Sequence, residues 1–141
     1  MIVDTSALAA IMFDEAGADG LLGALLGEPS FLPAPAQTEF QRVAALRDPG
    51  FNDIAEALLG KLEFAGMEVI AYDRSHARIA ASAHPSYGKG NGRGGLLNLL
   101  DLMVYAVAKD RDMPLLFTGR DFASTDVAVH PASRLTADDQ V

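Results

Sequence analysis

Apolar residues along the chain form two kinds of pattern, which alternate. Short, nearly continuous apolar runs occur at residues 1–3, 31–33, 67–72 and 114–118. Apolar positions recur three and four residues apart in the segments 7–12, 21–26, 40–47, 52–65, 73–83 and 98–110. Short apolar strands that alternate with amphipathic helices are typical of a parallel sheet covered on both faces. The pattern therefore predicts a single α/β domain over residues 1–141, with a parallel β-sheet flanked by helices on both faces.

Polar and glycine-rich segments mark the expected ends of these elements. Thr5 or Ser6 is expected to cap the first helix, and Asp48-Pro49-Gly50 to break the chain between two helices. The glycine-rich segment 88–95 is expected to form a mobile linker, and residues 127–130 to form a further strand. The linker contains a formal GxGxxG pattern, but a helix precedes it instead of a strand, so a dinucleotide site is not predicted.

Composition and charge narrow the possible functions. The chain has no cysteine, so disulfides and thiolate metal sites are excluded, and no apolar run long enough to cross a membrane. We therefore expect a cytoplasmic protein. A net charge of −8 argues against a broad basic face for nucleic acid. A protein of this charge that acts on nucleic acid needs divalent cations or a basic partner chain to supply positive charge.

Several acids lie where a solvated surface would not place them. Asp4 ends the first strand and Asp121 follows the strand 114–118, and ligands bind beyond the carboxyl ends of parallel strands. Asp121 also suits an ordinary turn or a helix cap. Asp126 is a weaker candidate in the same segment, and the hydroxyl of Thr118 is placed to support either Asp121 or Asp126.

Asp101 and Glu39 lie in expected helices. Only Asn98, Asp101 and Tyr105 interrupt the apolar run 96–108, so Asp101 is expected to be largely buried. The alternative for Asp101 is a structural role in the first helical turn, with Asn98 as the cap. Glu39 lies near the start of its helix, where the helix dipole alone favours an acid.

A cluster of carboxylates would point to a bound cation. Such groups repel and raise one another's pKa values unless a cation neutralises them, and oxygen ligands suit Mg²⁺ or Mn²⁺. A divalent ion of this kind polarises phosphoryl oxygens and activates water. The chemistry expected from the cluster is hydrolysis of a phosphodiester.

Four segments together resemble the PIN-domain ribonucleases, specifically the VapC toxins of bacterial toxin–antitoxin pairs. They are MIVDTSAL at residues 1–8, TEF at 38–40, LNLLDLMVYAVAK at 97–109 and LLFTGRDFASTDV at 115–127. The order and spacing of these segments match the family over essentially the whole chain. None of them would be specific alone.

The resemblance implies a fold, a site and partners. It implies an acidic pocket for Mg²⁺ or Mn²⁺ formed by Asp4, Glu39, Asp101 and Asp121, with Ser6, Asn98, Thr118 and Asp126 in support. It further implies cleavage of tRNA or rRNA, a homodimer, and inhibition by a VapB-like antitoxin whose basic tail enters the pocket. Such a tail would complement the charge of −8.

Two departures from the family pattern keep other functions open. Leu100 and Leu102 flank Asp101 where many relatives have smaller residues, and Arg120 precedes Asp121 where many have a second acid. The chain could therefore be a catalytically impaired binding module with the PIN fold. An aspartyl-nucleophile phosphatase is the other alternative, although Ser6 lies where that chemistry needs a second acid.

Overall fold

The computed structural model describes residues 1–135, and its centre is a four-stranded parallel sheet. The strands are β1 (Ile2–Val3), β2 (Phe31–Pro33), β3 (Glu68–Ile70) and β4 (Leu115–Leu116). Their order in the sheet is β3-β2-β1-β4, with Ile2 aligned to Phe31 on one side and to Leu115 on the other. The prediction of a parallel sheet is confirmed.

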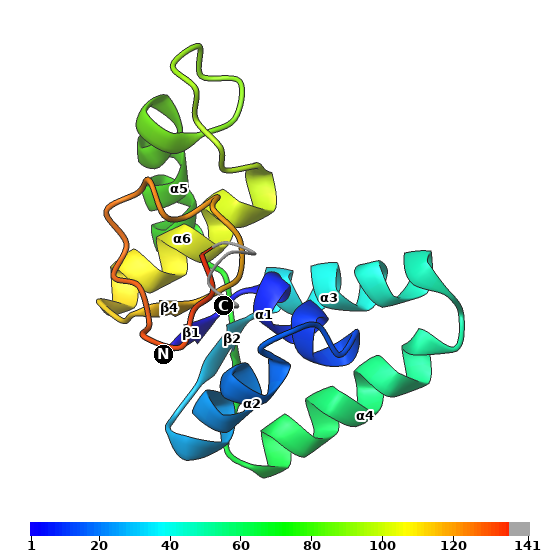
Figure 1. The fold of residues 1–141 in the computed structure, drawn as a ribbon. Helices are drawn as coiled ribbons and strands as arrows, with labels where there is room; N and C mark the ends of the chain where they lie inside the picture. Colours follow the sequence, from blue (N-terminus) through cyan, green and yellow to red (C-terminus); the bar gives the residue numbers. More distant parts are fainter. Residues whose placement is uncertain (136–141) are drawn as a thin grey trace.

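Within the described residues, six helices surround the sheet, on both of its faces. They are α1 (Thr5–Met12), α2 (Ala18–Gly27), α3 (Ala34–Arg47), α4 (Phe51–Phe64), α5 (Arg74–Tyr87) and α6 (Leu99–Arg111). Figure 1 shows α5 and α6 on one side of the strands and α1 to α4 on the other. None of these helices in residues 1–135 combines the length and apolar character of a membrane span.

The order of the strands reverses the direction of winding at one point of the sheet. The chain passes from β1 to β2 and on to β3, then returns through α5 and α6 to β4 on the other side of β1. The direction of winding therefore reverses between β1 and β4. In open α/β sheets, ligands bind at such a reversal, beyond the carboxyl ends of the strands. Residues that follow β1 and β4 are thus brought to one place.

The core explains why the two central strands end so abruptly. Ile2, Val3, Leu115 and Leu116 are fully buried, and α6 buries residues on nearly all sides from Leu102 to Ala108. Residues 1–3 and 115–116 therefore have no solvated face. The acid at position 4 is the first polar side chain after a buried strand, so its position is set by the core.

The structure differs from the sequence-based expectations in three local features. The prediction that Thr5 or Ser6 caps α1 is wrong, because Asp4 is the cap and the Thr5 hydroxyl donates to the carbonyl of Ala36 instead. Helix α5 continues past residue 83 to Tyr87, and the amide of Gly88 closes its last turn. Residues 127–130 form only an isolated parallel bridge to Leu115, not a full strand.

Candidate metal centre

Asp4 joins the end of β1 to the start of α1. Its Oδ2 accepts hydrogen bonds from the amide of Ser6 at 3.0 Å and from the Ser6 hydroxyl at 2.5 Å. Its Oδ1 is buried and has no hydrogen-bond partner among residues 1–135. A buried carboxylate oxygen without a donor is costly, so this atom calls for a ligand from outside the chain.

Ser6 connects the end of β1 to the end of β4. While its hydroxyl donates to Asp4, the same oxygen accepts a hydrogen bond from the amide of Thr118 at 3.0 Å. The Thr118 hydroxyl in turn lies 3.5 Å from the carbonyl of Ser6. These bonds fix the orientation of the Asp4 carboxylate and hold the two strand ends together.

Asp101 lies in the first turn of α6, where it forms a reciprocal cap with Asn98. The Asp101 amide donates to the Asn98 side chain at 2.9 Å, and Asp101 Oδ2 accepts from the Asn98 amide at 3.0 Å. The structural role considered from the sequence is therefore present. The second carboxylate oxygen takes no part in this cap, and the residue is only 7% exposed.

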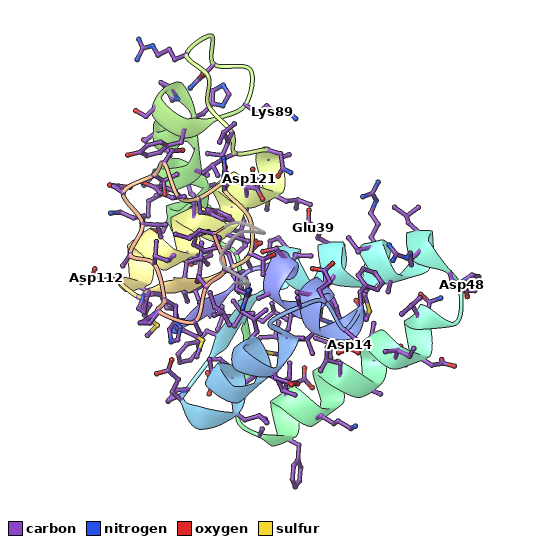
Figure 2. All side chains as sticks on the ribbon, in the orientation of Figure 1. Asp14, Glu39, Asp48, Lys89, Asp112 and Asp121 are labelled. Atoms are coloured by element: carbon purple, nitrogen blue, oxygen red, sulfur yellow. The ribbon has the colours of Figure 1, made fainter. Side chains whose placement is uncertain are left out.

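Glu39 and Asp121 reach the same region from two further elements. Glu39 is half-buried in the second turn of α3, and α3 packs against α6. Asp121 is exposed and follows β4 after Gly119, whose φ of +92° allows the chain to turn there. Figure 2 shows Glu39 and Asp121 on the same side of the molecule, beside the start of α6.

Electrostatic interactions connect the four acids through Asp101. Burial raises the pKa of Asp4 to about 6, assisted by the negative charge of Glu39 and opposed by the Ser6 hydrogen bonds. Burial also raises the pKa of Asp101 to about 7, and the charges of Asp4, Asp121 and Glu39 add to it. The structure thus brings together the four acids named from the sequence.

This arrangement suits a hard divalent cation. Within residues 1–135, no three acidic or histidine side chains already stand close enough to surround one ion. Mg²⁺ commonly uses only one or two carboxylates and keeps several waters, so the set needs no closed cage. The unpartnered Asp4 oxygen and the raised pKa of Asp101 both indicate negative charge that a cation would neutralise.

Asp126 lies apart from this centre. Its carboxylate accepts a hydrogen bond from the Tyr105 hydroxyl at 2.6 Å and pairs with Lys109 at 3.1 Å. The Tyr105 hydrogen bond is the main cause that lowers the pKa of Asp126. The sequence analysis did not assign a role to Tyr105 or Lys109. The signal was present, because Tyr105 is one of the polar interruptions in an apolar helix.

The glycine-rich segment before α6 is held by hydrogen bonds at both ends. The amide of Lys89 donates to the carbonyl of Leu97, and that of Leu97 to Tyr87. The Asn91 side chain accepts from the amides of Arg93 and Gly95 and donates to the carbonyl of Pro85. The segment is therefore a tied loop that positions the start of α6, which a composition-based expectation of a mobile linker did not anticipate.

The sequence is similar to known proteins over most of its length. The PIN domain family model matches residues 1–128. The chain is 42% identical to Ribonuclease VapC42 of Mycobacterium tuberculosis, over 90% of this chain and 96% of that protein. It is 37% identical to Ribonuclease VapC of Mycolicibacterium smegmatis, over 91% and 98%.

Solved structures show the same fold. A toxin–antitoxin complex from Klebsiella pneumoniae superposes with a TM-score of 0.67 at 19% identity, covering 92% of this chain and 96% of that one. VapBC2 from Rickettsia felis bound to a promoter DNA fragment gives 0.64 at 12% identity, covering 96% of each chain. Together with the match to the family model and the curated relatives, these findings place the chain in the PIN-domain family, among the VapC ribonucleases.

Proposed function

We propose that this protein is a metal-dependent endoribonuclease toxin whose active site is the four-acid centre. The observation that carries the proposal is the buried Oδ1 of Asp4, which has no hydrogen-bond partner among residues 1–135 and lies at the strand-order reversal. The charge of Asp4 also raises the pKa of Asp101, together with those of Asp121 and Glu39. In this proposal Asp4 and Asp101 hold Mg²⁺ or Mn²⁺. Glu39 and Asp121, which are more exposed, bind the ion through water or accept a proton from the attacking water.

The reaction is hydrolysis of an RNA phosphodiester. When bound, the divalent ion polarises the phosphoryl oxygens, lowers the pKa of a water molecule and stabilises the departing oxygen. A water oxygen forms the new bond to phosphorus and the bond to the 3′ oxygen breaks, so the products carry a 5′-phosphate and a 3′-hydroxyl. Ser6 and Asn98 orient the two principal carboxylates through the hydrogen bonds described above.

An antitoxin with a basic tail is the proposed inhibitor. Two of the structural neighbours are toxin–antitoxin complexes, and this chain carries a net charge of −8. A lysine or arginine side chain from a partner would neutralise the acidic centre in place of the metal. We further propose that the protein acts on tRNA or rRNA as a homodimer, as the family resemblance implies.

RNA cleavage by the purified protein, free of antitoxin, tests this proposal. Total cellular RNA is incubated with the protein in Mg²⁺ or Mn²⁺, and the new 5′ ends are mapped. We expect cuts at a few sites, which disappear with a chelator and with the Asp101→Asn variant. An Asp53→Asn variant, which changes an exposed acid in the first turn of α4, controls for loss of charge and should cleave normally.

The same experiment distinguishes the nuclease from a binding module. If the wild-type protein and Asp101→Asn leave the RNA equally intact with either metal, the nuclease proposal is wrong. Metal binding without cleavage would then favour the catalytically impaired PIN-fold module.

A further inference from the structure

A cavity of about 430 Å³ lies between α5 and α6, apart from the four acids. Residues of α5 form one wall of the cavity. Residues of α6 and of the segment after β4 form the other wall. Small residues such as Ser82, Ala83 and Ser86 occupy the α5 wall, where larger side chains would fill the space. The lining also includes Arg78, Tyr87, Tyr105, Lys109 and Asp126.

Two elements, α6 and the segment after β4, carry residues of both the acidic centre and the cavity. Tyr105 and Lys109 follow Asp101 on α6 by one and two turns, which is roughly 6 and 12 Å along the helix axis. Asp126 follows Asp121 by five residues in the segment after β4. A linear polymer held at the acids could therefore place its neighbouring unit in the cavity.

The charges of the cavity differ in sign from those of the acidic centre. Arg78 is exposed on α5 and has no ion-pair partner among residues 1–135, whereas Lys109 and the Tyr105 hydroxyl already bind both oxygens of Asp126. The lining therefore carries two positive charges, Arg78 and Lys109, and one negative charge, Asp126, which is already paired. In a chain with a net charge of −8, it offers an anion a local positive site.

The remaining lining groups suit a nucleotide. Tyr87 is half-buried, and its ring packs beside that of Tyr105 at a centroid distance of 5.6 Å. Unstacked RNA bases bind by stacking on aromatic rings and by hydrogen bonds to their edges, and serine hydroxyls both donate and accept. Ser82 and Ser86 supply such hydroxyls from the α5 wall of the cavity.

We infer that this cavity binds one nucleotide of the RNA substrate next to the scissile phosphate, with Arg78 on its phosphate and Tyr87 against its base. The inference rests on the proposed nuclease function and extends it to the substrate. It assigns the protein a single-stranded substrate with an unstacked nucleotide beside the cut, because a base within a duplex cannot enter the space between two helices.

The test compares two arginines on the same helix. Arg74 lies one turn before Arg78, is also exposed and does not line the cavity. A short fluorescein-labelled single-stranded RNA spanning a mapped cleavage site is bound to Arg78→Ala and Arg74→Ala, both in an Asp101→Asn background. We expect the Kd to rise about fivefold to tenfold for Arg78→Ala, with a salt slope smaller by about 0.7, and less than twofold for Arg74→Ala.

A blocking variant tests the cavity independently of charge. Ser82→Trp adds a large side chain to the exposed α5 wall and should leave the melting temperature nearly unchanged. In the cleavage assay it should lower kcat/KM at least tenfold for RNA.

The possible results separate the two proposals. If the wild-type protein cleaves RNA but Arg78→Ala matches Arg74→Ala and Ser82→Trp cleaves normally, the cavity inference is wrong while the nuclease stands. If Arg78→Ala weakens a complex with antitoxin but not with RNA, the cavity inference is wrong as well. If wild-type protein binds RNA through Arg78 without cutting it, the nuclease proposal fails, and the cavity inference is wrong in placing the nucleotide beside a scissile phosphate.

Discussion

Burial of the charged Asp101 carboxylate lowers the stability of the folded protein when no metal is bound. Its pKa of about 7, and that of Asp4 near 6, exceed the ordinary value of 3.8. The folded state therefore binds more protons than the unfolded state between about pH 4 and 7. It follows that stability from these two groups is greatest at low pH and is lost as pH rises through the folded pKa values.

We expect Asp101→Asn to stabilise the metal-free protein at pH 8. The amide can keep the reciprocal bonds with Asn98 and removes the buried charge, so the free energy of unfolding should rise by about 1 to 3 kcal/mol. Chemical denaturation with a chelator present measures the change. The gain should vanish near pH 4.5, and Asp53→Asn should show none at either pH; a destabilised Asp101→Asn at pH 8 would contradict the burial argument.

Ser6→Ala should impair the centre without removing an acid. The variant loses the hydroxyl that donates to Asp4 and leaves the amide of Thr118 without its acceptor. We expect a loss of about 1 to 2 kcal/mol in stability and roughly tenfold in kcat/KM. Thr38→Ala, which changes an exposed hydroxyl on α3, is the control. Equal activity of Ser6→Ala and wild type would show that Asp4 needs no such support.

At the scale of elements, the sequence predicts features that depend on local patterns, such as helix bounds. It does not predict features that depend on contacts between distant segments. The helix expected at residues 98–110 is α6 at Leu99–Arg111 with Asn98 as its cap, because both its apolar run and its cap are local signals. Thr5 does not cap α1 as the sequence predicts, because its hydroxyl donates to the carbonyl of Ala36, thirty-one residues distant. The hydrogen bonds that tie the loop 88–95 likewise depend on partners on α5 and before α6.

Two glycines test whether the tied loop matters to α6. A Cβ at Gly95 would lie 2.3 Å from the carbonyl oxygen of Gly88, so Gly95→Ala must displace backbone. We expect it to lower the free energy of unfolding by about 1 to 3 kcal/mol and to reduce cleavage. Gly60→Ala lies in open space on the exposed side of α4 and should stabilise by about 0.5 to 1 kcal/mol. Thermal unfolding of both variants tests the contrast, and a Gly95→Ala protein as stable as wild type would refute it.

At the scale of the whole molecule, the sheet order assembles the site. Each acid could be suspected from its own surroundings, but their mutual approach depends on β1 lying between β2 and β4, which strand patterns alone do not specify. For the same reason Asp126 could not be separated from Asp121 by sequence: both follow β4, and only the packing of α6 pairs Asp126 with Lys109. The family resemblance supplied the grouping that single residues could not.

Calorimetric titration of Mn²⁺ into the metal-free protein at pH 7.5 is the most direct test of the acidic centre. We expect the wild-type protein and Asp126→Asn to bind Mn²⁺ alike, and Asp101→Asn to lose at least tenfold in affinity. At pH 5.5, protonation of Asp4 and Asp101 should weaken binding to the wild-type protein at least tenfold. Failure of the wild-type protein to bind Mn²⁺, or equal binding by Asp101→Asn, would contradict a metal centre built on these acids.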